Sequence, residues 1–475
     1  MNASLLLNSL AVALGTLTLA WLAGLVMAIA TATASPRTRR VWLGLTILNL
    51  ALPPFLIANV WLDLTATWRS LSSPQAVAGG SLPLTALAVS SLLWPLTSLL
   101  MLGGWGKLQP EHLEADSLGR GWWLLRRLLL PAARAESIVA AAITLVLALA
   151  NFTVPTLFQV RVFTEEFWIR FNTQFDLNGA LRATWPLLVV PVLLLLFLRG
   201  RSVSWPRRQV SLPPELLRHQ LGGIATWARY LGGLWLTLTL GMPLFRLLLT
   251  HRTWTELAGT VAAGHSAIWV SAWTAAGTAT LVVSLGLLAG GSSSCGRLPR
   301  WIWLLFLVPG VLLGVGLILL FNRPGLGAIY QRLGIVFLAL TLRYLAPGWS
   351  LVSATLRSVD SSLVDVARSL GAGRWRVLRD AILPQSWRGL AAAWYAVYLL
   401  CLWDVETVVL IQPPGGETLA LRIFNLLHYG HAAQVNALCV VMLTLAAAPG
   451  LVWGIVQAIS RRRGGASRLG AESRP

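Results

Sequence analysis

Long apolar stretches restrict the fold of this chain more than any other feature of its sequence. A helix that crosses a bilayer needs about 20 mostly apolar residues, and eleven stretches meet this requirement. Only 11% of the 475 residues are charged, whereas soluble globular proteins carry about 25%. The sequence therefore predicts an all-α polytopic membrane protein in contact with the lipid bilayer. The predicted spans cover residues 5–30, 41–65, 82–103, 137–159, 181–199, 227–250, 266–290, 300–322, 332–356, 389–411 and 435–458.

Basic residues cluster in every second segment between the predicted spans. Cytoplasmic segments of membrane proteins carry an excess of Lys and Arg, and most of the 37 basic residues lie inside if the N-terminus is outside. We therefore predict an N-out, C-in topology, with residues 461–475 as a basic cytoplasmic tail. Because topology accounts for the net charge of +20, we expect no nucleic-acid partner.

The chain contains an internal repeat. Residues 15–19 (GTLTL) match residues 277–281 (GTATL), and the Leu-Pro-Pro at Pro53 matches the Val-Pro-Gly at Pro309. Proline removes a backbone donor from a helix, so we expect kinks at both prolines. The repeat predicts two tandem five-helix units, with an extra helix between them that brings equivalent loops to the same side. The predicted units are residues 1–200 and 263–460, and residues 201–262 form a cytoplasmic linker plus the extra helix.

A long basic loop follows the third predicted span of each unit. Each loop contains a matching heptad that ends in glycine, which reaches positive φ without steric cost and so suits a turn. One such loop alone could be an ordinary amphipathic segment at the membrane surface, but two at equivalent places indicate a shared function. The loops cover 110–136 and 357–388, with heptads LEADSLG at 113–119 and DVARSLG at 365–371 and Leu-Pro pairs ending at Pro131 and Pro384.

These loops resemble the EAA motif of binding-protein-dependent transport permeases. In that motif an acid and two alanines precede a glycine, and a Leu-Pro pair follows. The second loop has Val366 in place of one alanine, and the first has Leu113 in place of the acid. The resemblance implies a short helix that inserts into a groove on an ATPase, a turn at the glycine, and a second helix ending near the proline. The implied ATPase-coupling residues are Glu114, Ala115, Gly119, Pro131, Asp365, Ala367, Gly371 and Pro384.

The wider chain is similar to fused permeases of the iron(III)/thiamine importer type. The residues that carry this similarity are CLWDVE at 401–406, PPGGETLA at 413–420, RIFN at 422–425 and NFTVP at 151–155. The resemblance implies a MetI-like fold in a bacterial inner membrane, an ATPase subunit in two copies and an external solute-binding protein. It also implies ferric iron or thiamine as cargo. Such permeases usually have twelve spans, one more than predicted here.

Sequence motifs for catalysis do not appear. The chain has no GxxxxGK[ST] phosphate loop and no GxSxG nucleophile elbow, so we expect a transport subunit without ATPase activity of its own, and no cofactor. His428 and His431 lie three residues apart, but this spacing alone is a poor metal signature, and we expect a solvated pair. The cysteines show no zinc-ligand spacing.

Three charged residues fall within predicted spans, where a charge costs about 2.5–3.5 kcal/mol at the bilayer centre. Arg343 lies in the middle of the ninth span, and Asp404 and Glu406 lie toward the outer end of the tenth. We expect a buried structural partner for Arg343. The acids either form an internal ion pair or extend to the interface, or they line a substrate path together with Asn151.

The main alternative function is a secondary transporter driven by an ion gradient, since such proteins also contain internal repeats. That class predicts acids near the midplane, but the 17 Asp and Glu residues lie mostly in loops. It also leaves the two matched loops unexplained. A membrane-embedded enzyme would need a polar cluster that the sequence does not show.

Overall fold

The computed structural model describes residues 3–71, 77–114, 119–174, 177–198, 212–290 and 300–472, and this part of the chain forms helices, turns and coil without strands. Six of its helices are long and apolar enough to cross a membrane, or eight if two sharply bent helix pairs are each one span. The chain is therefore a multi-pass membrane protein, as predicted. The eleven spans, the two-unit layout and the orientation stay predictions. The six helices are Ser4–Ala32, Leu82–Trp105, Gly223–Leu249, His251–Ala289, Gly334–Arg357 and Ala432–Val452.

The second predicted span, 41–65, is not one helix. α2 (Pro36–Leu50) and α3 (Pro54–Leu71) meet at an angle of 87°. Pro53 and Pro54 lack the backbone N–H that would continue the helix, so the predicted kink is a near right-angle break. The other helices of this part are α1 (Ala3–Ala32), α4 (Val77–Trp105), α5 (Pro110–Glu114), α6 (Trp122–Leu124), the π-helical η2 (Leu125–Leu129), α7 (Leu130–Ala132), α8 (Arg134–Ala150), α9 (Thr153–Leu157), α10 (Phe163–Ile169), η3 (Arg170–Gln174), α11 (Leu177–Thr184) and α12 (Pro186–Phe197).

The connection between the two parts is more helical than predicted. We expected an external loop between spans 227–250 and 266–290, but only Thr250 separates α15 from α16. Residues 251–265 contain no proline, so nothing stops the helix that continues into the seventh predicted span. The helices here are α13 (Pro214–Leu221), α14 (Gly223–Leu236), the π-helical η4 (Thr237–Gly241), α15 (Met242–Leu249) and the 40-residue α16 (His251–Gly290).

The final part of the chain shows two further breaks. The predicted span 300–322 is interrupted at Pro309, which confirms the expected kink, and the predicted span 389–411 ends as a helix at Leu402. The helices are η5 (Arg300–Ile302), α17 (Trp303–Leu307), α18 (Gly310–Phe321), α19 (Gly327–Tyr330), α20 (Gly334–Arg357), α21 (Ser361–Ser369), α22 (Arg374–Arg376), the π-helical η6 (Val377–Ile382), α23 (Leu383–Leu402), α24 (Leu419–His428) and α25 (Ala432–Glu472).

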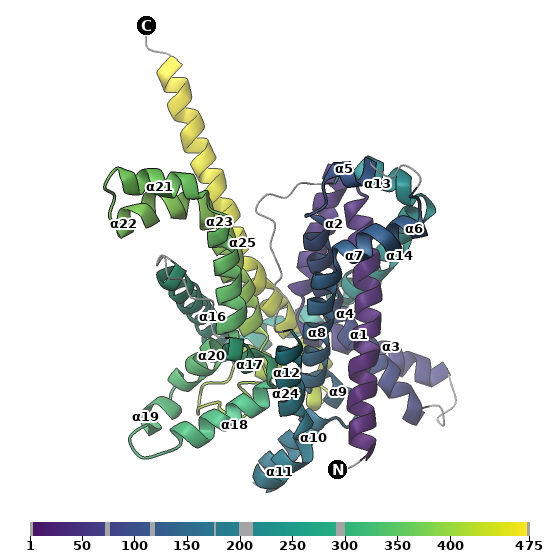
Figure 1. Ribbon diagram of the computed structural model, residues 1–475. Helices are drawn as coiled ribbons and strands as arrows, with labels where there is room; N and C mark the ends of the chain where they lie inside the picture. The colour runs from purple at the N-terminus through teal and green to yellow at the C-terminus, as the bar shows by residue number, and fades with distance from the viewer. Residues whose placement is uncertain are drawn as a thin grey trace.

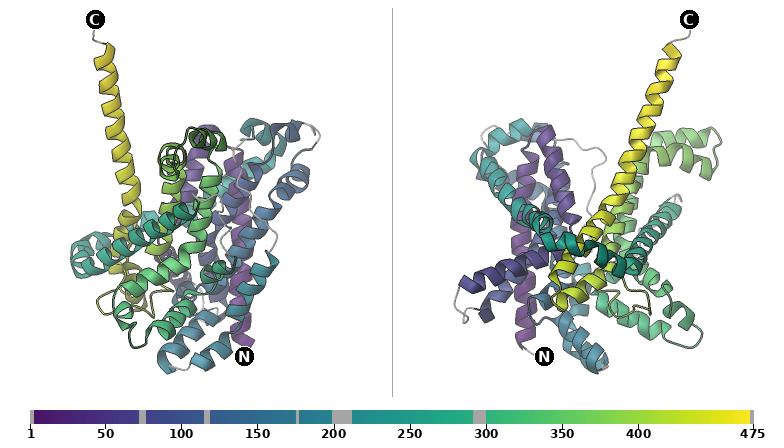
Figure 2. Two further views of the ribbon diagram at one scale, coloured as in Figure 1. Left: turned by 60° about the vertical axis from the view of Figure 1, so that its left-hand side comes forward. Right: turned by 180° about the vertical axis from the view of Figure 1, so that it is seen from behind.

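The helices form two groups that lie side by side (Figures 1 and 2). α1, α4 and α8 pack together in the first group, and α16, α20, α23 and α25 pack together in the second. The groups meet where α8 and α12 contact α17, where α9 contacts α24 and where α3 contacts α25. One apolar core runs through both groups. Large apolar side chains such as Trp269 and Trp273 point outward from α16 with about 70% of their surface exposed (72% and 68%), as expected for a lipid-facing surface.

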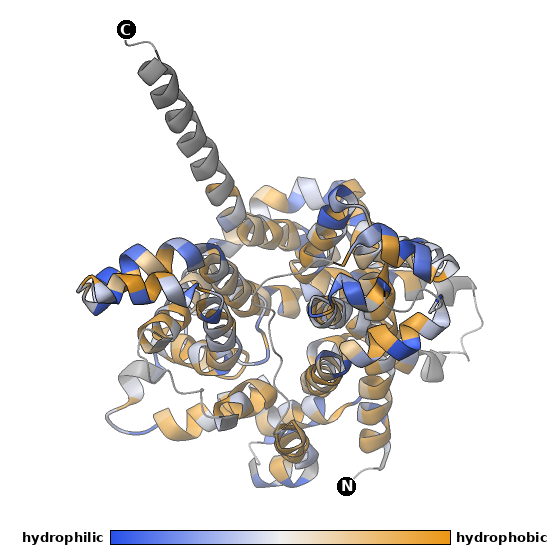
Figure 3. Ribbon diagram, turned by 45° about the horizontal axis from the view of Figure 1, so that its top comes forward, coloured by the Kyte–Doolittle hydropathy of each residue, from blue (hydrophilic) through white to orange (hydrophobic). Residues whose placement is uncertain are grey.

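The two long loops lie at the same end of the molecule. Figure 1 shows α5, α6 and α13 at the top of one group and α21 and α22 at the top of the other, with α11 and α19 at the opposite end. Figure 3, which brings the top forward, shows hydrophilic residues concentrated in these segments, whereas the helices beneath are mainly hydrophobic. The arrangement agrees with our expectation that both loops face the same side of the membrane.

Candidate functional site

The second long loop has the helix, turn and glycine that its sequence predicts. Asp360 caps α21 by accepting a hydrogen bond from the backbone N–H of Ser362 at 3.0 Å. Gly371 has φ of +78°, which favours glycine. Gly371 N donates to Arg368 O at 2.9 Å and Ala372 N donates to Ala367 O at 3.1 Å, so the helix ends in a Schellman motif. The predicted turn at the glycine is confirmed.

The expected helix end near the proline is confirmed in the first loop and wrong in the second. In the second loop, α22, η6 and α23 follow one another without a gap, and Pro384 lies in the first turn of α23. In the first loop, α6, η2 and α7 pass through Pro131, but α7 ends at Ala132, and α8 begins at Arg134 after a bend of 74°. Each proline lies two residues after the end of a π-helical turn, and this wider turn accommodates a residue that cannot donate the usual backbone hydrogen bond.

The surface of α21 and its C-cap residue carries an apolar ridge whose side chains are more than half exposed. Its residues Leu363, Val366 and Leu370 are 53%, 56% and 82% exposed and follow the spacing of one helical face. Asp365 and Arg368 flank the ridge, with their charged atoms 3.7 Å apart. No residue of α21 is buried. The ridge therefore has the composition of a docking surface for another protein.

The first loop differs from the second at the matched positions. Leu113, which aligns with the exposed Asp365, is fully buried. Gly119 is buried as well, whereas Gly371 is exposed. Glu114 is exposed at the end of the five-residue α5, and Ala115 lies outside the described residues. The first loop therefore lacks an exposed helix comparable to α21 within the part that the structure describes.

A buried ion cluster joins α20 to the turn that follows α23. Arg343 Nη2 lies 3.1 Å from Glu406 Oε2, and Arg343 Nε lies 3.4 Å from Asp404 Oδ2. The side chains of Arg343 and Asp404 are 5% and 2% exposed. The expected buried partner of Arg343 is therefore present, and it consists of the two acids predicted from the tenth span. Contact of either acid with cargo stays a prediction.

Asp404 also explains why the helix stops before the acids. Asp404 Oδ1 accepts a hydrogen bond from Thr407 N at 2.8 Å, and its Oδ2 accepts from Thr407 Oγ1 at 2.6 Å and from the Tyr344 hydroxyl at 2.8 Å. Aspartate side chains that bind nearby backbone N–H groups favour turns over helix interiors. The acids therefore lie in a turn after α23, not within the predicted helix.

The first part of the chain contains a neutral version of the same turn. Aligning Pro131 with Pro384 matches Asn151 to Asp404, and Asn151 Oδ1 accepts from Val154 N at 3.0 Å just as Asp404 accepts from Thr407 N. This hydrogen bond ends α8 at Ala150, so the predicted span 137–159 is too long. The turn at Asn151 lies where the helix groups meet, because the Phe152 ring packs edge-on against Phe424 of α24 at 5.5 Å.

Gly310 lies where a side chain would collide with the ion cluster. A Cβ at this position would lie 2.7 Å from Thr407 N and 2.8 Å from Arg343 Nη1. We expect Gly310→Ala to lower the free energy of unfolding by about 1–3 kcal/mol, which thermal unfolding of the detergent-solubilised protein would measure. Gly316→Ala in the same helix is the control, since nothing lies within 4 Å of its Cβ. Equal destabilisation by both changes would contradict this prediction.

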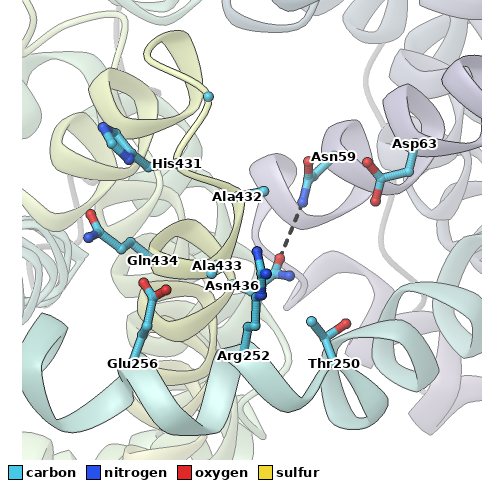
Figure 4. Close-up of a pocket in the computed structure, with 11 residues that line it drawn as sticks. Asn59, Asp63, Thr250, Arg252, Glu256, His431, Ala432, Ala433, Gln434 and Asn436 are labelled. Carbon is cyan, nitrogen blue, oxygen red and sulfur yellow. Dashed lines mark hydrogen bonds between the residues drawn. The ribbon is translucent and has the colours of Figure 1, made fainter.

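A polar cavity of about 400 Å³ opens between α3, the α15–α16 turn and the start of α25 (Figure 4). Its volume falls in the range of small-molecule sites. Asn59 Nδ2 donates to Asn436 Oδ1 at 3.2 Å and so links α3 to α25 across the cavity. The predicted topology places all of these segments on the external side. The lining includes Asn59, Asp63, Thr250, Arg252, Glu256, His431, Gln434 and Asn436.

Sequence reasoning did not predict this cavity. One sequence feature could have indicated the cavity, because Asn59 and Asp63 lie four residues apart in a predicted span and share a helical face. His428 and His431 lie in different environments. His431 lines the cavity, whereas the His428 ring stacks on Phe424. Among the described residues, no group of three or more potential metal ligands occurs.

Comparison with known proteins supports a transport role for the second helix group. Residues 283–463 match the family model described as the binding-protein-dependent transport system inner membrane component. This stretch is similar to a permease domain of this kind. The match includes α20, α21, the Gly371 turn and the ion cluster. The matched region therefore contains both the exposed ridge and the buried charges.

Curated proteins similar to this chain are transport proteins as well. The chain is 28% identical over 147 residues to the spermidine/putrescine transport system permease protein PotC of Haemophilus influenzae, covering 31% of this chain and 56% of that protein. PotC of Escherichia coli K12 is 28% identical over 144 residues, with 30% and 53% coverage. The putative 2-aminoethylphosphonate transport system permease protein PhnV of Salmonella paratyphi A is 29% identical over 156 residues, with 31% and 57% coverage.

The chain thus spans about half the length of the curated relatives it matches. The names of these three relatives mention polyamines and an aminophosphonate, so the expectation of iron or thiamine as cargo gains no support. Their description as permease proteins agrees with a transport subunit and does not favour an enzyme.

Proposed function

We propose that this chain is the membrane permease of an ATP-driven importer, with two pore-forming units fused in one polypeptide. Residues 1–200 and 263–460 are the two units, and cargo crosses between them. A separate ATPase in two copies drives the transport cycle from the side that carries α21, and an external solute-binding protein delivers cargo to the opposite side. The observation that carries this proposal is the exposed ridge of α21, with the Gly371 turn beside it, inside a permease domain.

The ridge supports coupling to an ATPase because a partner can bind its apolar surface at a low cost in free energy. Leu363, Val366 and Leu370 are already exposed, so docking needs no rearrangement of the core. The remaining surface of α21 carries charged residues, and Asp360 caps the start of the helix. The cap keeps α21 helical before a partner binds. The buried ion cluster joins α20 to the turn after α23, where it can hold the second helix group rigid while α21 is pushed. An ion-gradient transporter has no need of such a ridge.

The polar cavity suits the external mouth of this path. It lies between segments of both proposed units, and its mixture of amides, acids and Arg252 favours a small polar solute over an apolar one. Asp63, which pairs with Arg246 at 3.1 Å, links the cavity to α15. We propose that cargo passes from the binding protein into this cavity before it reaches the turns at Asn151 and Asp404.

Val366→Asp should weaken the binding of the ATPase at least about tenfold, because it places a charge at the centre of the apolar ridge and a central apolar contact is worth about 2 kcal/mol. A tagged pull-down from gently solubilised membranes, with co-purifying proteins identified by mass, measures this. Leu326→Asp is the matched control, since Leu326 is also exposed and directly precedes α19, which lies at the opposite end. If the unaltered chain recovers no ATPase under conditions that preserve a known importer, the proposed function fails.

A further inference from the structure

The linker helix α13 covers the first long loop. Gln220 Nε2 donates to Leu113 O at 2.7 Å, and Gly121 N donates to Gln220 O at 2.8 Å. One residue of α13 therefore contacts the first loop at two places. Leu217 and Leu221 of α13 are buried in the same apolar cluster as Leu113, and burying each leucine contributes about 1.5–3 kcal/mol. α13 is thus a firmly attached part of this surface.

Further contacts anchor the first loop to the helices beneath it. Lys107 forms an ion pair with Glu136, and the Trp105 indole donates to Leu129 O at 2.8 Å. The second loop has fewer ties, since α21 is joined to α23 by a hydrogen bond from Asp360 N to Gln385 Oε1 at 3.1 Å and has no buried residue. The two loops that would face the ATPase therefore differ: one projects a helix and the other is covered by α13.

The exposed face of α13 repeats the charge pattern of α21. In α21 an acid and an arginine lie three residues apart, at Asp365 and Arg368, and both are exposed. In α13 the same pair occurs at Glu215 and Arg218, and both are exposed. The first loop has Leu113 and Asp116 at the positions matched to the α21 pair, so its own sequence lacks the pattern. Two identical ATPase copies need similar charges at both contacts, and α13 restores them.

We propose that α13 provides the docking surface for the ATPase copy at the first unit, because the described residues of the first loop contain no exposed helix comparable to α21. This inference rests on the proposed function. Trp123 of the loop lies beside this surface and matches Trp375 of the second loop, and the two are 49% and 70% exposed. The importer then has one projecting contact, α21, and one composite contact formed by α13 and the first loop.

Site-specific photocrosslinking in membranes tests this assignment. A photoreactive amino acid replaces His219, which is exposed on α13 beside Arg218, or Leu363 on α21, or Leu326 at the opposite end as the control. The probe partner is the tagged ATPase recovered in the pull-down. We expect crosslinks to the ATPase from positions 219 and 363 and none from position 326. Crosslinks from 363 without 219 would overturn the assignment of α13 and leave the proposed function standing, whereas crosslinks from neither would overturn both.

Charge reversal at Arg218 provides a second test. If α13 had only a structural role, this change would not alter the number of bound ATPase copies. Arg218 is exposed, so Arg218→Glu leaves the buried leucines and the Gln220 hydrogen bonds in place. By native mass spectrometry of the purified complex we expect mostly one ATPase copy per permease in place of two, with Arg218→Lys retaining two. Two copies bound to the Arg218→Glu variant as tightly as to the unaltered chain would overturn the assignment.

Discussion

Gly371→Asp should abolish uptake while leaving the amount of folded protein in membranes unchanged. Gly371 has φ of +78°, a region that costs other residues about 1–2 kcal/mol, and an acidic side chain there lies beside the apolar ridge of α21. Nothing lies within 4 Å of a Cβ at this position, so the core is undisturbed. Uptake of radiolabelled cargo and the yield of monodisperse protein after solubilisation measure the two effects separately.

Gly371→Asn is the matched control, because asparagine adopts positive φ more readily than other residues and adds no charge. We expect it to retain a substantial fraction of uptake. Normal gradient-driven uptake by the Gly371→Asp variant with no ATPase present would contradict the importer and support the secondary-transporter alternative.

Arg343→Met should be the most destabilising single change in residues 283–463. Removing the guanidinium leaves Asp404 and Glu406 without their cation, and breaking a buried ion pair from one side costs about 3–5 kcal/mol. The methionine fills similar space, so the loss comes from charge and hydrogen bonds, including the one that Arg343 Nη1 donates to Val308 O at 3.2 Å. We expect a sharply lower thermal midpoint and a reduced yield of folded protein in detergent.

Two comparisons distinguish charge from packing at this cluster. Arg368→Met removes an exposed partner of Asp365, and such surface pairs contribute at most about 1 kcal/mol, so its midpoint should barely change. Adding Glu406→Gln to Arg343→Met removes one uncompensated acid and should recover part of the lost stability. If the double variant is no more stable than Arg343→Met alone, the ion cluster does not stabilise the fold as described.

Local chemistry predicted the features that depend on one or two residues. Gly371 was expected to form a turn because glycine alone reaches positive φ freely, and the structure confirms it. Pro53 and Pro309 were expected to interrupt helices for lack of an N–H donor, and both do. Arg343 was expected to have a buried partner because an unpaired charge inside a membrane protein is expensive. In each case the physical constraint lies within the residue itself.

Features that depend on distant residues could not be predicted in the same way. The partners of Arg343 lie about sixty residues further along the chain (Asp404 and Glu406), and their placement needs the turn that Asp404 itself creates. The burial of Leu113 depends on Gln220 and Leu217 of the linker, a segment without any matched counterpart in the repeat. The polar cavity collects residues from three separate segments, and no periodicity in the sequence connects them.

The continuous helix α16 has a mechanical consequence for a transporter that must change shape. At 1.5 Å per residue, its 40 residues extend about 60 Å, and it packs along α20, α23 and α25. The second helix group is thus built around a stiff rod that begins one residue after α15, so the rod pivots at Thr250 on the rim of the polar cavity. A rotation of about 5° at this pivot would displace the far end of α16 by roughly 5 Å. A small rotation of α16 at the cavity would therefore produce a large displacement at the opposite membrane face.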